Sequence, residues 1–154
     1  MPYGSQTSLT ISTNGNVAIP VTPTPTGTLK LDGSADYVVG TGTSAVTITS
    51  SDVVGYKLYI KSVSTTNLVN GGANIAASTN GAPAELGVNT WGYNTDASIN
   101  YVGSTLSDVL IKTGTGPHTS GDVTNVTFGV KIDNAKPAGN YSNTVQYTAV
   151  PQTN

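Results

Sequence analysis

The pattern of apolar and polar positions is clearest in the C-terminal third of the chain. Apolar side chains alternate with polar or small ones from Val126 to Ile132, and again from Tyr141 to Ala149. Successive side chains of a strand point to opposite faces of a sheet, so strict alternation indicates a half-buried strand. We therefore predict two long strands with a short connection, 134–139, which form a hairpin or a corner between two sheets.

The same period recurs in shorter runs upstream. In residues 56–63, Tyr56, Leu58 and Ile60 share one face, and Lys57, Tyr59 and Lys61 share the other. Residues 91–93 and 109–111 have the aromatic or branched composition of short strands. Residues 67–86 are rich in Asn and Gly and are interpreted as a loop, with one helical turn at 73–78.

The N-terminal stretch has strand alternation of its own. Asn14-Gly15 separates its two halves and signals a hairpin, and the Thr-Pro repeat at 22–26 indicates an edge or an extended linker. We therefore divide the chain into an N-terminal strand arm with its Thr/Pro linker, 1–26, and a β-sandwich domain, 27–154. The arm is a candidate for pairing with a neighbouring molecule's sheet edge; alternatively it pairs within its own domain. The candidate residues for strand donation are Leu9, Ile11, Val17, Ile19 and Val21.

Composition favours an all-β fold. Only 9% of the residues are charged and 36% are hydrophobic, and Thr, Ser, Asn and Gly replace the missing charge. These are residues of strands and turns. About nine short strands in such a chain predict an antiparallel β-sandwich, immunoglobulin-like or jelly-roll-like.

Charge and cysteine content exclude several classes of function. Six lysines, no arginine and eight acidic residues give a net charge of -2, so no basic patch for nucleic acid is expected. The absence of cysteine excludes disulfides, thiol nucleophiles and cysteine-bound metals. No apolar run reaches about 18 residues, so no membrane insertion is expected. Low charge with abundant Thr, Asn and Gly is common in secreted bacterial surface proteins, and we expect an extracellular or cell-surface location.

Residues with catalytic chemistry are sparse. His118 is the only histidine, and with Asp122 nearby it would have to serve any Ser-His-Asp arrangement; without a Gly-x-Ser-x-Gly elbow, a surface-loop histidine is the better interpretation. Glu85 is the only glutamate, and its spacing to Asp96 and Asp108 indicates no glycosidase pair. We predict that the protein is not an enzyme and needs no cofactor.

Two small oxygen clusters leave a structural calcium ion open. Asp32 and Asp36 lie four residues apart in a turn, and Asp96 follows Asn94. Neither cluster matches an EF-hand loop, and aspartates in such places also cap turns.

Three aromatic side chains fit either a ligand site or the core. Trp91 and Tyr93 share strand parity and point the same way, and Tyr101 follows in the chain. On an outward face they form a platform for a sugar ring; on an inward face they are core. A carbohydrate-binding module with glycan ligands is therefore the alternative to a structural role.

Lysines bear on intramolecular isopeptide bonds, which some Gram-positive surface domains form between Lys and Asn beside a buried acid. Lys30, Lys57, Lys61 and Lys131 alternate with apolar neighbours. We expect these lysines to face solvent, and such a bond is therefore disfavoured.

The connection before the last strand carries a glycine and a tyrosine with defined roles. Gly139 tolerates a positive φ or a close backbone approach. Tyr141 is either a simple core aromatic or a tyrosine corner, in which the hydroxyl reaches back to the main chain.

Short motifs across most of the chain resemble a set of secreted bacterial surface domains. The set shares an AGxY…YT hairpin, a GYxL strand and a WGY strand, and fimbrial and immunoglobulin-like domains also use the AGxY turn. The resemblance implies a β-sandwich displayed outside the cell, in adhesion or in an assembly such as a pilus or fibre. The implied partners are copies of the chain or other surface proteins, and the set has no common catalytic residues. The matching segments are Ala138-Gly139-Asn140-Tyr141 with Val145-Gln146-Tyr147-Thr148, Gly55-Tyr56-Lys57-Leu58, and Trp91-Gly92-Tyr93.

Overall fold

The protein is all-β over the residues that the computed structural model describes. These are residues 9–12, 16–21, 38–51, 53–133, 135–137 and 139–152. They form ten strands and contain no helix, and hence no helix that could cross a membrane. The strands are β1 (Leu9–Ser12), β2 (Asn16–Val21), β3 (Val38–Ser50), β4 (Gly55–Ser62), β5 (Leu68–Asn70), β6 (Ala73–Ala77), β7 (Thr90–Asn94), β8 (Val109–Thr115), β9 (Asp122–Ile132) and β10 (Gly139–Gln152).

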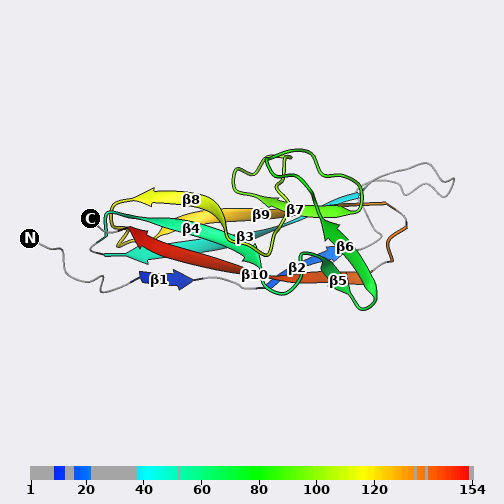
Figure 1. Ribbon diagram of the computed structural model, residues 1–154, viewed down its shortest axis with the longest axis horizontal. Helices are drawn as coiled ribbons and strands as arrows, with labels where there is room; N and C mark the ends of the chain where they lie inside the picture. The colour runs from blue at the N-terminus through cyan, green and yellow to red at the C-terminus, as the bar shows by residue number, and fades with distance from the viewer. Residues whose placement is uncertain are drawn as a thin grey trace, which may run out of the picture.

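The strands form one continuous hydrogen-bonded path. Its order is β1-β3-β9-β7-β6-β5-β10-β4-β8, and β2 joins it by pairing with β10 (Figure 1). Neighbours are antiparallel except β6 and β7, which run parallel. The expected all-β class is confirmed. The expected nine strands and two separate sheets of a sandwich are not, because ten described strands share one mixed sheet.

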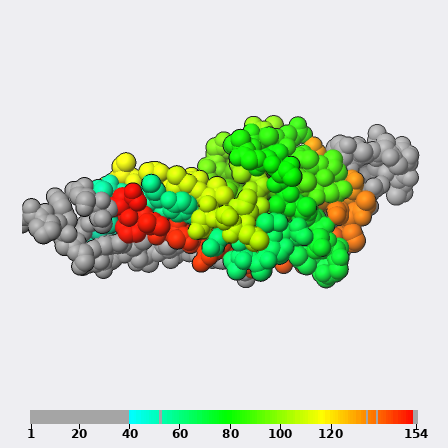
Figure 2. Space-filling model, in the orientation of Figure 1, coloured from blue at the N-terminus to red at the C-terminus, as the bar shows by residue number. Residues whose placement is uncertain are grey.

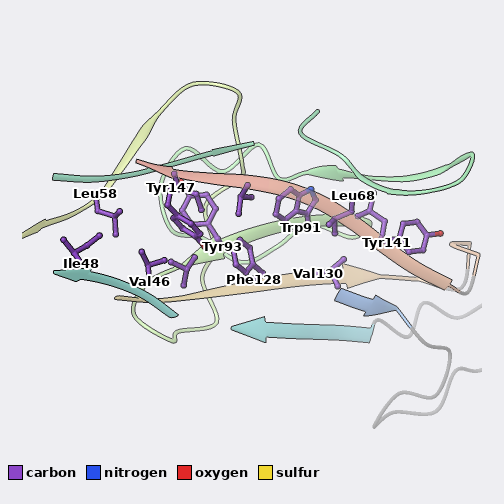
Figure 3. Packing of buried hydrophobic residues seen from close by; sticks show 14 of the residues in the cluster. Val46, Ile48, Leu58, Leu68, Trp91, Tyr93, Phe128, Val130, Tyr141 and Tyr147 are labelled. Carbon is purple, nitrogen blue, oxygen red and sulfur yellow. The ribbon is translucent and has the colours of Figure 1, made fainter. Parts of the chain in front are cut away.

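The path turns back on itself, so that β3, β9 and β7 lie on one side of the buried residues and β10 and β4 on the other (Figure 3). The two long C-terminal strands are not paired with each other. β9 pairs with β3 and β7, whereas β10 pairs with β2, β4 and β5. The predicted hairpin between them is therefore wrong, and a corner between two sheets stays a prediction.

Alternation along the long strands builds the core, as predicted. In β10 the buried side chains are Tyr141, Asn143, Val145 and Tyr147, and the residues between them are exposed. β9 and β4 bury every second residue over most of their length. Full burial of one such aliphatic or aromatic side chain stabilises the fold by about 1.5–3 kcal/mol. The largest fully buried side chains are Trp91, Tyr56, Tyr141, Phe128, Ile48, Leu58, Ile60, Leu68, Ile75, Val46 and Val126.

Residues 68–77 form a hairpin, and the predicted loop with a helical turn at 73–78 is wrong there. β5 and β6 pair across a two-residue turn, with Asn70 opposite Ala73. Gly71 takes the left-handed conformation that this turn needs, with φ 56°. Leu68 is paired with Ile75, and both side chains are buried. Burial of this pair outweighs the weak strand propensity of the Ala and Asn residues around it.

The corner before β10 is a tyrosine corner. The buried Tyr141 hydroxyl donates a hydrogen bond of 2.8 Å to the Pro137 carbonyl oxygen. Gly139 has φ 152°, and a Cβ there would collide with the Asn70 side-chain amide. Both expectations for Gly139, a positive φ and a close approach, are therefore confirmed, and so is the tyrosine corner.

Candidate functional site

The N-terminal strands lie on two separate sheet edges. β1 pairs with the end of β3, and β2 pairs with the start of β10. The hairpin predicted at Asn14-Gly15 is therefore wrong: the two strands have different partners and follow one another along the molecule (Figure 1). The arm pairs within its own chain in this structure. Donation to a second chain, and the division at residues 26 and 27, remain predictions.

β3 and β10 each have two edges: one pairs with a strand of the arm, and the other pairs with the rest of the sheet. Ile48 of β3 pairs with Asp122 of β9 on one edge and with Ile11 on the other. Ser142 of β10 pairs likewise with Val69 and with Ala18. Without β1 and β2, the described strands leave backbone groups of both edges without a strand partner. Such groups are a template for another chain.

The arm's register sets its apolar residues against core-facing positions. Ile11 is paired with Ile48 and Ile19 with Tyr141, and both of those partners are fully buried. Of the remaining donation candidates, Leu9 is opposite Ser50 and Val17 opposite Asn143, both buried, whereas Val21 is opposite the partly exposed Gly139. Residues directly opposite each other share a face of the sheet, so the alternation of the arm fits the faces of β3 and β10.

The proposed aromatic platform is buried, so the exposed sugar site near Trp91 and Tyr93 is wrong. Trp91 is 0% exposed and Tyr93 4%, and they lie between the layers of the fold (Figure 3). Trp91 Nε1 donates to the Thr66 carbonyl at 2.8 Å, and its ring centroid lies 6.4 Å from that of Phe128. Strand parity predicted one common face, and that face is the core.

Tyr101 is also buried, because it covers two glycines. A Cβ on Gly129 would lie 2.5 Å from the Tyr101 ring, and one on Gly92 would lie 3.2 Å from Tyr101 Cβ. The ring therefore packs against bare backbone of β7 and β9, and offers no platform to a sugar.

The structure brings three polar side chains together around the Asp122 carboxylate. Tyr56 donates to Asp122 Oδ2 at 2.5 Å, and Lys112 donates to Asp122 Oδ1 at 2.7 Å. His118 Nε2 lies 3.7 Å from Asp122 Oδ2, and its ring meets Tyr56 edge-on with centroids 5.6 Å apart. Sequence analysis found His118 and Asp122 but missed Lys112 and Tyr56, which β8 and β4 contribute; no local spacing signals this meeting.

The electrostatics of this cluster suit a structural link between β4, β8 and β9. Burial alone would raise the pKa of Asp122, but the hydrogen bonds from Lys112 and Tyr56 outweigh it and hold the pKa below its usual range. Burial, followed by the bond to Asp122, raises the pKa of Tyr56 above its ordinary value. An ionised carboxylate that already accepts two donors is a poor general base near neutral pH. Ser50 Oγ accepts a hydrogen bond from the His118 backbone N at 3.0 Å, which fixes the loop before β9.

The remaining acidic candidates are dispersed. Asp96 Oδ1 accepts the Ser98 backbone N–H at 3.0 Å, as a turn cap does. Asp108 lies 3.7 Å from Lys61, and Glu85 pairs with Lys131 at 2.7 Å. No group of three metal-ligating side chains occurs among the described residues. Asp32 and Asp36 fall outside them, so the calcium question stays open there.

The lysines follow the predicted parity. Lys57, Lys61 and Lys131 lie between buried neighbours on the outer face, partly exposed. Lys30 lies outside the described residues. The lysine closest to a carboxylate in a shielded setting is Lys112, in the ion pair with Asp122.

A shallow groove of about 290 Å³ opens between the end of β7 and the start of β8. Its walls are mostly apolar, with Asn94 and Asp96 at one side. Figure 2 shows this face, where residues near 110 (yellow) lie against those at 80–100 (green). Leu110 is 48% exposed at its rim. Asn94 already donates to two loop carbonyls, so its amide supports the loop 95–100.

Comparison with known proteins gives no relative. No protein-family model matches the chain, and no match was found among curated proteins or among solved structures.

Proposed function

We propose that this chain is a non-catalytic structural protein outside the cell, a subunit or displayed domain of a bacterial surface assembly such as a pilus, fibre or adhesin. The observation that carries the proposal is the N-terminal segment along two sheet edges. Its pairings are backbone ladders in a defined register, and main-chain bonds of this type join chains as readily as segments of one chain.

The distribution of polar chemistry supports the same proposal. The Asp122 carboxylate accepts hydrogen bonds from Lys112 and Tyr56, and the large aromatic side chains belong to the core. A chain with 9% charged residues, rich in Thr, Asn and Gly, fits the secreted surface domains that the sequence resembles. Copies of the chain or other surface proteins are the partners that we propose.

The finer architecture belongs to this proposal too. We propose a β-sandwich of immunoglobulin-like type, with β3, β9 and β7 in one layer and β10, β4 and β8 in the other. The corner between β9 and β10 supports it, since these strands run in opposite layers. The hydrogen bond from Tyr141 to Pro137 is a second support, because tyrosine corners are typical of such sandwiches.

The test is electron microscopy of the purified chain beside a version that lacks residues 1–26. Filaments from the full chain that vanish on truncation support the proposal. Monodisperse particles from the full chain at every concentration up to the solubility limit overturn self-assembly. Circular dichroism reports whether the truncated version is folded. If the truncated version is not folded, the full chain is examined instead with an excess of a synthetic peptide of residues 7–26. Shorter filaments in the presence of the peptide support the proposal, and unchanged filaments count against a role for the arm.

A further inference from the structure

The N-terminal arm lacks the charged side chains that keep many edge strands from pairing with another molecule. Edge strands are normally protected by charges, above all lysine, by proline or by bulges, and of these devices β2 carries one proline, Pro20. The first 29 residues contain no Asp, Glu, Lys or Arg. Both strands of the arm are therefore neutral, and no charge opposes their pairing with another sheet.

The register of the arm is strongly specified. A shift by one residue would set Ile19 opposite the exposed Ser142 or Asn140, and no longer opposite the buried Tyr141. Because side chains alternate between faces, every apolar residue of β2 would change face together. A second copy carries the same β3 and β10, so the register that fits the arm to its own chain also fits it to that copy, and a shift by one residue is disfavoured there too.

The connection to the rest of the chain is long enough for exchange. Residues 22–37 join β2 to β3, and at about 3.3 Å per extended residue they span up to roughly 50 Å. That span exceeds the distance between neighbouring small domains in contact, whose radii are about 13–15 Å. An arm can therefore leave its own edges and reach those of a neighbour while β3 to β10 keep their places.

We propose that residues 9–21 of one copy pair with β3 and β10 of the next, in the register seen within the chain. This inference rests on the proposed function and names its partner, a second copy, and its acceptor edges. Each copy both gives an arm and accepts one, so exchange along a row of copies gives a head-to-tail series, whereas reciprocal exchange between two copies gives a closed dimer. Paired residues are identical in the closed and exchanged forms. The balance between the two forms is therefore set by the protein concentration, compared with the effective concentration of the arm at its own edges, which is of about millimolar order for a short linker.

Cysteine cross-linking tests this, because the chain contains no cysteine of its own. Ala18 is paired with Ser142, an exposed residue of β10. One batch of protein carries Ala18→Cys and another carries Ser142→Cys; they are mixed at rising concentration and oxidised. The expected product is a covalent heterodimer whose yield rises with concentration. The matched control replaces Ser142→Cys by Thr144→Cys, which lies on the same face two residues out of register, and should give at least fivefold less.

A single chain with both Ala18→Cys and Ser142→Cys separates the possible failures. Oxidised in dilute solution, it locks the arm onto its own body, and we expect it to form no filaments until it is reduced. Filaments from the locked protein would overturn the exchange and leave the structural role intact. No filaments from the parent chain, with cross-links within chains only, would overturn both. Equal heterodimer yields from Ser142→Cys and Thr144→Cys would overturn the register.

Discussion

The hydrogen bond of the tyrosine corner can be removed without disturbing the packing around it. Tyr141→Phe deletes only the hydroxyl that donates to the Pro137 carbonyl at 2.8 Å. The ring is fully buried, and phenylalanine fills the same volume, so no cavity opens.

The magnitude follows from what happens to the acceptor. A neutral hydrogen bond contributes about 1 kcal/mol net, and an acceptor left buried costs about 1–3 kcal/mol. Pro137 is exposed, so water can replace the lost donor and the lower figure applies. We expect a loss of about 1 kcal/mol of unfolding free energy, which lowers Tm by about 2–4 °C in a domain of this size.

Urea unfolding monitored by circular dichroism measures this difference. Tyr59→Phe is the matched control: Tyr59 lies on the outer face of β4, and its hydroxyl has no hydrogen-bond partner among the described residues. It should change stability by less than about 0.5 kcal/mol. If Tyr141→Phe and Tyr59→Phe give the same small change, the corner bond contributes nothing and the reasoning is refuted.

Three further predictions concern the buried aromatics and the Asp122 cluster. Trp91, the only tryptophan, should emit at short wavelength and resist acrylamide quenching, with no change when glycans are added; efficient quenching would show an exposed ring. Gly114→Ala should lose about 1–3 kcal/mol, since its Cβ would enter the Tyr56 ring, whereas Gly42→Ala meets no atom within 4 Å and should be neutral or stabilising. The folded pKa of Asp122 lies below its unfolded value, so its stabilisation is complete above about pH 4 and is lost as pH falls through the folded pKa; unfolding titrations of Asp122→Asn should show a flatter acid limb, and an unchanged limb would contradict the ion pair.

Strands with one buried face could be predicted from the sequence. In β4, β9 and β10 the period-2 pattern gave both the strand and its buried face, and Tyr141 with Gly139 gave the corner. The hairpin at Leu68 and Ile75 was missed, because each strand is too short to show a period and carries Ala and Asn.

The predictions that failed concern residues whose partners lie far away in the chain. Parity placed Trp91 and Tyr93 on one face, but which face is inward depends on the layer opposite. The Asn14-Gly15 signal is local, while the partners of the arm lie in β3 and β10. Tyr56, Lys112 and Asp122 come from three strands, and only the topology of β4, β8 and β9 brings them together.

The pairing of β2 with β10 also orders the events of folding. It joins residues 16–21 to residues 139–144, so the arm is synthesised well before its partner. Contacts this distant in sequence carry a large loop-closure entropy and slow the search for the native state. The arm should therefore dock after the transition state, with φ-values near zero. Substitutions in β2 would then speed unfolding and leave the folding rate nearly unchanged. Newly made chains, meanwhile, pass through a stage in which β2 is complete and its partner β10 does not yet exist.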